Sequence, residues 1–487
     1  MDIADADLIS NLPEVLLSLI ISHLSVAESV RTSILSRKWK NIWKSSSCLH
    51  FDKKFLTKSC TDIYNRDEPF RRFYRKRLHD EISQATGLVE RVIDSHETKL
   101  VTCSISHIQD DFKSGLLARL IKNLEEKKRI EELFLTCEEL FVSDKLQCNL
   151  PAGIFFCRTL RVLELNGYWL KDASPFEGCR NLVTLSLKSV STDDQTLTRV
   201  VFNCMFLEDL SICSCTGIKR MEIRDQNLKS LKLKDLELEG IDINAKCLSI
   251  LVLDSVLCSL NMQINSPSLL EFGFSFDGGL AQKSTQIYSR IIDFLERCCG
   301  LLILNISIPP RSWGPSDWEL PYPTFMFWEK RELYDSITHS LKVVGMKGFC
   351  GKEREIIFAK HLIRKAPMLR RFVIECDKNC SERGARETSA LPLEPRASIN
   401  LFIVLKPEQV GESVSCIACM YMELYSALIV FGALPPSLFS YALKSFVYAI
   451  KITIPEGLCL YGVLGLLRWS GIGIILARLV WLIHCNG

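Results

Sequence analysis

One leucine pattern constrains the fold of this chain more than any other feature. The pattern L-x-x-L-x-L returns along the middle of the sequence, and from Leu160 to Leu269 it recurs at steps of 20 to 25 residues. A single strand with its return cannot bury its apolar side alone, so each unit must stack on the next one. The spacing therefore predicts a solenoid of short parallel strands with helical or irregular returns.

Steps of this length are typical of leucine-rich repeats. The copies of the pattern are Ile130-Leu133-Leu135, Leu160-Leu163-Leu165, Leu182-Leu185-Leu187, Leu207-Leu210-Ile212, Leu228-Leu231-Leu233, Leu248-Leu251-Leu253 and the degraded Leu269-Phe272-Phe274. We assign residues 130–310 to the repeats and place the fold in the α/β class.

Alternate strand positions should face away from the leucine core, on the inner curve of the solenoid. Their side chains are small or of mixed charge, which suits a protein or peptide partner better than a phosphate-rich one. The candidate target contacts are Glu164, Asn166, Ser186, Lys188, Asp209, Ser211, Lys232, Lys234 and Asp254. The same register turns Val162, Thr184, Cys213, Ser230, Ile250 and Val252 outward.

Composition narrows the classes of function. The chain has 487 residues, enough for two or three domains. Its formal charge of +3 argues against a chain-wide nucleic-acid binder, and its 47% hydrophobic content excludes general disorder.

The 21 cysteines are predicted to be reduced and mostly structural. The N-terminus lacks the basic start and apolar core of a secretory signal. Three repeats place a cysteine three residues before their first leucine, at Cys157, Cys179 and Cys204, where a small buried side chain is expected. The Cys416–Cys419 pair has no second pair at zinc-site separation, so we predict no metal and no cofactor.

The first fifty residues predict three short helices. Residues 10–24 form the first, with Asn11 and Glu14 at capping-box spacing, and a second runs from Val26 to about Leu35. Ser36 can cap a third, in which Trp39, Ile42 and Trp43 share one face. Three such helices have more apolar surface than they can hide among themselves, which predicts a partner.

These residues resemble a plant F-box over residues 8–50. The similarity lies in Leu12-Pro13, Leu16-Leu17, Ile20, Val30-Arg31-Thr32-Ser33 and Leu35-Ser36-Arg37-Lys38-Trp39 with Trp43. The resemblance implies a three-helix domain that docks on the Skp-type adaptor of a cullin-RING ubiquitin ligase. The adaptor contacts that it implies are Leu12, Pro13, Leu16, Leu17, Ile20, Val30, Ser33 and Leu35, while Trp39 and Trp43 are expected in the core.

Residues 51–129 should join the F-box to the repeats as a linker and N-terminal cap. Residues Lys99 to His107 predict a strand, and Leu116 to Ile130 predict an amphipathic helix. The basic cluster from Arg71 to Arg77 has two interpretations, a solvated helix face or a nuclear-import signal.

An aromatic, proline-rich loop is expected at residues 311–335, either as a capture loop or folded over the solenoid end. Residues 336–405 then resemble the FBD domain of one plant F-box/leucine-rich-repeat family, including the closing Pro395-Arg396-Ala397-Ser398. The resemblance implies an α/β cap, with a strand at Leu341 to Met346, a helix from Glu353 to Lys365 and a strand at Leu369 to Ile374. The segment from Asn379 to Leu393 looks looser than the family's final helix.

The hydrophobic tail, residues 406–487, differs from the rest of the chain. Residues 399–487 contain only nine charged side chains, about a third of the density elsewhere. Residues 424–443 and 463–483 are apolar and long enough to span a bilayer, although Pro435 and Pro436 interrupt the first. A membrane anchor, an apolar partner-binding extension and a mispredicted extension that never folds are all open interpretations.

The family resemblance implies a non-catalytic, substrate-recognition subunit of an SCF-type ubiquitin ligase, located in the cytoplasm, the nucleus or both. Its partners would be the adaptor, through it the ligase core, and an unknown target protein. The alternative is an F-box scaffold that assembles no ligase, membrane-held if residues 463–483 insert. An enzyme acting through a cysteine such as Cys213 or Cys215 is a third hypothesis, supported only by the cysteine count.

Overall fold

The computed structural model describes residues 12–52, 87–97, 99–108, 116–125, 129–138, 148–150, 157–275, 300–307, 340–351, 353–377 and 382–406, with a few single positions between them. The described residues divide into two compact units, the first within residues 1–144 and the second within residues 145–408. The basic cluster at 71–77, the aromatic loop at 311–335 and the hydrophobic tail lie outside the described residues.

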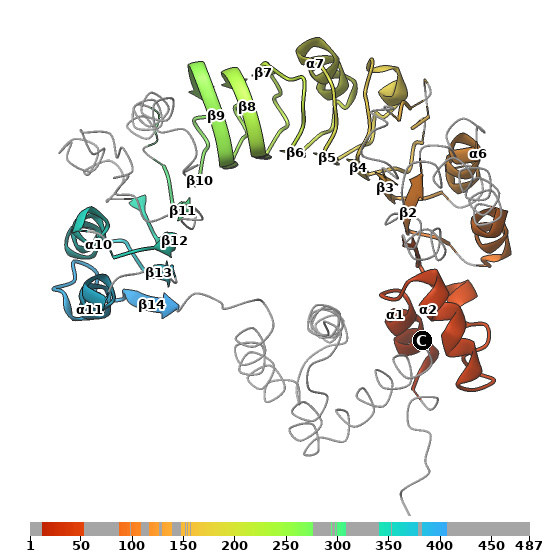
Figure 1. Cartoon of the computed structure of the whole chain (residues 1–487), viewed down its shortest axis with the longest axis horizontal. Helices are drawn as coiled ribbons and strands as arrows, with labels where there is room; N and C mark the ends of the chain where they lie inside the picture. Colours follow the sequence, from red (N-terminus) through yellow and green to blue (C-terminus); the bar gives the residue numbers. More distant parts are fainter. Residues whose placement is uncertain are drawn as a thin grey trace, which may run out of the picture. The chain divides into compact units, whose positions relative to one another are not determined.

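The first unit begins with short helices (Figure 1), which pack around a small apolar core. They are α1 (Glu14–Ile21), α2 (Val26–Arg31) and the 3-10 helices η2 (Thr32–Ile34) and η3 (Ile42–Ser45). The core consists of Leu17, Ile20, Ile21, Trp39 and Ile42, with Leu12, Leu24, Leu35 and Trp43 packed against it. The predicted core role of Trp39 is confirmed, and Trp43 is partly buried beside it.

Two local predictions for these helices need correction. Helix α1 begins at Glu14 after Pro13, which makes no side-chain cap, and Asn11 lies outside the described residues. The capping box is at α2 instead, where the Glu28 N–H donates to Ser25 Oγ at 3.3 Å and the Ser25 N–H donates to Glu28 Oε2 at 2.8 Å. The expected third helix is only η3, and Trp39 lies in the turn before it.

Three parallel strands complete the described part of the first unit. They are β1 (Cys48–Phe51), β2 (Thr102–Ile108) and β3 (Glu132–Glu138), accompanied by a helix over residues 87–95 and by α6 (Leu116–Asn123). The strand predicted over residues 99–107 is confirmed as β2, whereas β1 was not predicted. The predicted helix begins at Leu116 as expected, but α6 ends at Asn123 and Ile130 is not helical. The His50 ring bonds Ser22 O at 3.0 Å, which ties β1 to the helical region. The His96 ring bonds Ser46 O at 2.6 Å, which ties the end of the helix over residues 87–95 to the residue after η3.

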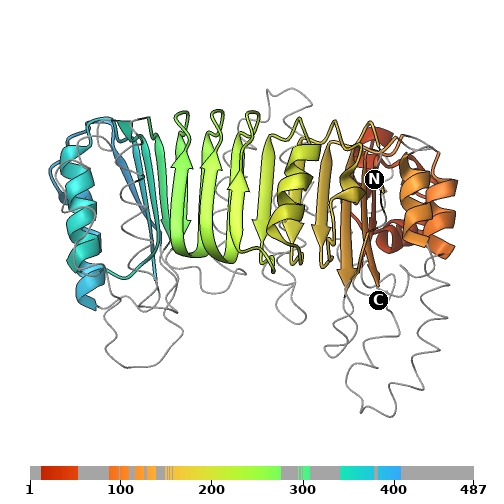
Figure 2. The ribbon, with the colours of Figure 1, turned by 90° about the horizontal axis from the view of Figure 1, so that it is seen from above.

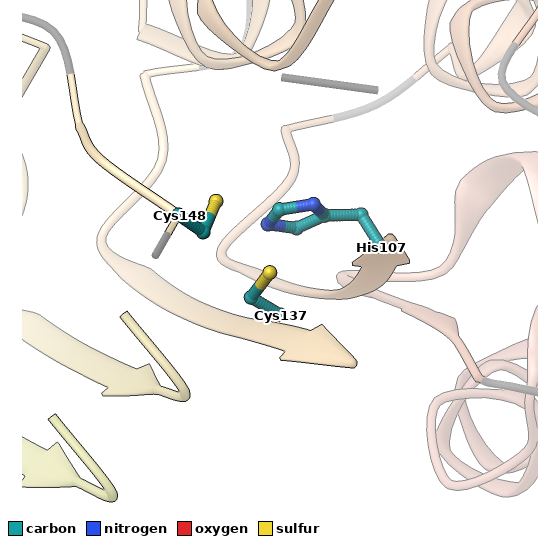
Figure 3. Close-up of side chains that lie close together, drawn as sticks. All are labelled: His107, Cys137 and Cys148. Carbon is teal, nitrogen blue, oxygen red and sulfur yellow. The ribbon is translucent and has the colours of Figure 1, made fainter. Parts of the chain in front are cut away.

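A buried histidine and a buried cysteine face each other at the ends of β2 and β3. His107 and Cys137 are register partners, and their nitrogen and sulfur atoms lie within 4.8 Å (Figure 3). Cys148, labelled in the same figure, belongs to the second unit. Structural zinc sites take four ligands, so this pair alone defines no metal site.

The second unit contains a row of parallel strands (Figure 2). The order is β4 (Val162–Asn166), β5 (Thr184–Lys188), β6 (Asp209–Cys213), β8 (Ser230–Asn244), β9 (Ile250–Asn265), β10 (Glu271–Ser275), β11 (Ile303–Ser307), β12 (Val343–Phe349), β13 (Arg371–Cys376) and β14 (Phe402–Lys406). The repeat leucines of these strands are buried, which confirms the predicted leucine core.

The returns between these strands differ from the prediction. Helix α7 (Asp194–Asn203) is the helical return between β5 and β6, and the 3-10 helix η5 (Ser174–Phe176) precedes β5. From β6 onward two returns are extended: β7 (Arg220–Ile223) pairs with the second half of β8, and that half pairs with β9. The second half of β8 buries Leu236, Leu238, Ile241 and Ile243, an alternating pattern that a strand satisfies and a helix does not.

The end of the second unit matches the predicted order of strand, helix and strand. Helix α10 (Glu353–Lys365) has the predicted bounds and separates β12 from β13. The segment expected to be loose forms helix α11 (Glu382–Ala390), followed by the 3-10 helix η7 (Leu391–Leu393), and the unpredicted β14 pairs with β13. Arg396 closes this turn by donating to Leu401 O at 2.8 Å and to Pro392 O at 2.9 Å.

The repeat cysteines are small core side chains, as predicted. Cys157, Cys179 and Cys204 are all buried, and the Cys179 thiol donates to Phe155 O at 3.1 Å. Burial raises the pKa of the Cys204 thiol to about 12, so this group stays protonated at neutral pH.

Among the described residues, no helix is both long enough and apolar enough to cross a membrane. The two apolar stretches at 424–443 and 463–483 fall outside that part of the chain.

Candidate binding surfaces

Four of the residues predicted to contact an adaptor face the core of the first unit. Leu17 has no exposed surface and Ile20 is buried, because both lie on the side of α1 that packs on Trp39 and Ile42. Leu12 and Leu35 are partly buried against the same core. The structure therefore leaves little of these four side chains for a partner.

The other predicted contacts are more open. Pro13 and Val30 are exposed, and Leu16 and Ser33 are partly buried. The Ser33 hydroxyl donates to Lys40 O at 3.4 Å. Their role as adaptor contacts stays a prediction.

Two exposed apolar residues were missed by sequence reasoning. Val15 is 78% exposed on α1 and Ile34 is 75% exposed in η2. No sequence signal singled out Val15, because the apolar residues of α1 cover almost its whole circumference and do not show which side faces outward.

The predicted outward positions of the repeats line one side of the sheet, which we call the open face. In β4, β5 and β6 the burial alternates, with Glu164, Ser186 and Ser211 half-buried at the middle outward position. Helices α7, α10 and α11 lie on the other side of the strands (Figure 1). The predicted orientation is thus confirmed, with one exception: Ser230 is buried, since its short side chain lies between the register partners Asp209 and Ile250.

Ion pairs between neighbouring strands order the open face. Lys188 Nζ lies 2.8 Å from Glu164 Oε1, and Lys234 Nζ lies 2.9 Å from Asp254 Oδ2. Ser275 Oγ donates to Asp254 Oδ1 at 2.6 Å. Although burial would raise the pKa of Asp254, hydrogen bonds from Ser275 and Lys234 outweigh it and hold that pKa below its ordinary value. The hydrogen bond from Lys234 to Asp254 in turn raises the pKa of Lys234.

Of the two cysteines named in the enzyme hypothesis, Cys215 has an environment that disfavours a thiolate. Cys215 is buried, and its burial raises the pKa of the thiol to about 11. The group donates weakly to Leu187 O at 3.5 Å. Catalytic cysteines need a lowered pKa, so Cys215 is a packing residue.

The two units together define a leucine-rich-repeat protein with a small N-terminal helical domain, and comparisons with known proteins identify that domain. The profile of the F-box domain matches residues 9–51. The profile described as "FBD-associated F-box protein At5g56370, LRR repeats" matches residues 117–281.

Curated relatives from Arabidopsis thaliana agree. F-box protein At1g80960 is 28% identical over 55% of this chain and 53% of its own length. The probable FBD-associated F-box protein At1g32375 is 30% identical over 52% and 55%, and the F-box/FBD/LRR-repeat protein At1g51370 is 28% identical over 61% and 62%. The chain spans about half the length of the first curated relatives it matches. It combines an F-box domain with leucine-rich repeats of the FBD-associated type, as the resemblance predicted.

Proposed function

We propose that this chain is a substrate-recognition subunit of an SCF-type ubiquitin ligase. In this role the F-box binds a Skp-type adaptor, and the open face of the repeats binds a target protein. The mechanism is proximity: a tethered target meets the ubiquitin-loaded enzyme at a high effective concentration, so the chain needs no nucleophile or general base of its own.

The exposed apolar surface of the F-box supports this proposal most directly. Val15 and Ile34 expose large apolar side chains, together with Pro13 and Val30, although a buried core is available in the same domain. Burial of apolar surface against a partner stabilises the complex by about 25 cal/mol for each Å² removed from water. We infer that these four residues form the centre of the adaptor contact and that Leu17 and Ile20 support it from the core.

Adaptor binding by the full chain tests the proposal. We expect a purified Skp-type adaptor to bind the unmodified chain, and Val15→Asp or Ile34→Asp to weaken that affinity at least tenfold, because each places a charge in an apolar contact. Leu393→Asp is the matched control, since Leu393 is equally exposed but belongs to the second unit.

Absence of any adaptor affinity in the unmodified chain would reject the ligase proposal. Equal affinity of the Val15→Asp, Ile34→Asp and unmodified chains would reject the assigned contact. A chain that binds the adaptor but never recruits the cullin would support the alternative, an F-box scaffold without ligase activity.

A further inference from the structure

The open face changes character between β8 and β13. From β4 to β8 its outward side chains are polar or charged, apart from Val162 on the first of these strands. Across β9 to β13 it carries a half-buried apolar strip, which Glu271 on β10 and Asn305 on β11 interrupt. The apolar side chains of the strip are Ile250, Val252, Ile303, Val343 and Val373. Polar rims around an apolar centre are the usual anatomy of a protein-binding surface.

Two glycines at the centre of this strip leave room for neighbouring side chains to pack over the main chain. Gly273 and Gly345 occupy the middle outward position of β10 and β12, on either side of Asn305. A methyl group on Gly273 would already touch Val252 Cγ at 3.5 Å, and one on Gly345 would lie 2.6 Å from Asn305 Oδ1. The side chains of Val252 and Asn305 therefore pack over the main chain at these glycines, and Gly273 is buried.

The charges around the strip are not balanced. Between β8 and β13 two carboxylates of the open face are paired with a lysine: Asp254 binds Lys234, and Glu375 lies 3.7 Å from Lys347 Nζ. The third, Glu271, lies within the strip and accepts a hydrogen bond from the neutral Asn305 Nδ2 at 3.0 Å. Lys232 and Arg371 are exposed and make no ion pair with any residue that the structure describes.

The two unpaired cations lie at opposite ends of the apolar strip. Lys232 is on β8 beside Val252, and Arg371 is on β13 beside Val343. Five strand-to-strand steps separate β8 from β13, which at about 4.8 Å for each step gives roughly 24 Å. An extended chain rises about 3.3 Å for each residue and crosses this distance in about seven residues.

We propose that β8 to β13 bind an extended, acidic segment of a target protein. One carboxylate of the segment would pair with Lys232, a second about seven residues away would pair with Arg371, and apolar side chains between them would cover the strip. Charge complementarity selects such a segment over a basic one, which would meet two uncompensated cations. This inference deepens the proposed function, and it rests on the open face being the target site.

Selection from a random library of displayed twelve-residue peptides tests the proposal on the full chain. We expect the unmodified chain to enrich peptides with two acidic residues about seven positions apart and apolar residues between them. The Lys232→Glu chain should enrich peptides in which one of the two acidic residues is replaced by a basic residue. The Arg371→Glu chain should enrich peptides in which the other acidic residue is replaced. Lys246→Glu, in the turn between β8 and β9, is the matched control and should select the same peptides as the unmodified chain.

Affinities of one enriched peptide give the quantitative test. We expect Lys232→Glu and Arg371→Glu each to weaken its affinity at least tenfold, and a rise from 50 to 500 mM salt to weaken it further, because the pairs are exposed. Circular dichroism and the melting temperature establish that each variant folds.

Enrichment without paired acidic residues, enrichment that survives both charge reversals, or no enrichment would each overturn the inference. Adaptor affinity measured on the same preparations separates this result from the proposed function. A chain that binds the adaptor but selects no acidic peptide rejects the acidic-segment inference alone. A chain that selects the peptides but binds no adaptor rejects the ligase role alone.

Discussion

Lys234 and Asp254 are direct register partners on β8 and β9, and their charged groups lie 2.9 Å apart on the open face. Ser275 holds the other carboxylate oxygen of Asp254 at 2.6 Å, and it also accepts a hydrogen bond from the Ser255 N–H at the same distance. A single carboxylate thus connects three successive strands at one end of the apolar strip. The ionised carboxylate of Asp254 therefore helps to hold the side chains of Lys234 and Ser275 in place on the open face.

The first prediction follows from the lowered pKa of Asp254. A carboxyl group with a lowered folded-state pKa contributes stability above its unfolded-state pKa, and that stability is lost as pH falls through the folded value. Asp254→Asn should therefore lower the free energy of unfolding by about 0.5 kcal/mol at pH 6, a small value because the pair is partly exposed. The difference should shrink toward pH 3 in urea titrations.

Asp209→Asn is the control for this prediction. Asp209 is on the same face, and the described residues include no ion-pair partner for it. A stability difference for Asp254→Asn that is the same at pH 6 and pH 3 would contradict the assigned role of the ionised carboxylate.

The second prediction separates core from surface on helix α1. Leu17 is fully buried and Val15 is 78% exposed. Leu17→Ala should cost about 2 to 5 kcal/mol of stability because it leaves a cavity, whereas Val15→Ala should change stability by less than about 0.5 kcal/mol. Chemical unfolding of the full chain measures both values. Equal costs for the two variants would show that the assigned faces of α1 are wrong.

A third prediction concerns a close main-chain approach at the end of the second unit. A methyl group on Gly384 in α11 would lie 2.7 Å from Cys350 O and 2.9 Å from Gly351 O. Both contacts are with backbone, which cannot rotate away, so Gly384→Ala should destabilise the chain by about 1 to 3 kcal/mol. Gly87→Ala is the control, because nothing lies within 4 Å of the added methyl group. A melting temperature of Gly384→Ala equal to that of the control would exclude this packing.

The fourth prediction uses the different environments of two cysteines of the second unit. Cys247 is exposed, whereas Cys204 has no exposed surface and burial raises its pKa to about 12. Iodoacetamide reacts with thiolates, so at pH 8 it should modify Cys247 in the folded chain and reach Cys204 only after denaturation. Peptide mass spectrometry after timed quenching reads both sites. Early modification of Cys204 would mean that this turn of the solenoid opens in the folded state.

The solenoid itself could be predicted because its signal is local. Each repeat leucine, such as Leu185 or Leu210, needs only its own strand and a fixed period to be assigned to the core. The same holds for α10, whose apolar period and flanking turns fix its bounds at Glu353 and Lys365. Strand β14 was missed because its five residues form a strand only by pairing with β13.

The extended returns between β7 and β9 could be assigned only from the tertiary structure. Leu236 and Leu238 alternate as a strand does, but their register with β9 and the shift near Gly240 depend on how the coils stack. Stacking also decides which charges meet, because Lys234 and Asp254 are twenty residues apart in sequence and adjacent only in the sheet.

The sequence by itself determined the F-box motif, the leucine core and the side of each strand that faces outward, because periodicity and burial act within each repeat. Only the tertiary structure decided which apolar residues of α1 remain exposed and which cations of the open face lack a partner. Exposure and charge balance depend on neighbours brought together from distant parts of the chain. For that reason Val15, Ile34, Lys232 and Arg371 became the residues to test only once the fold was known.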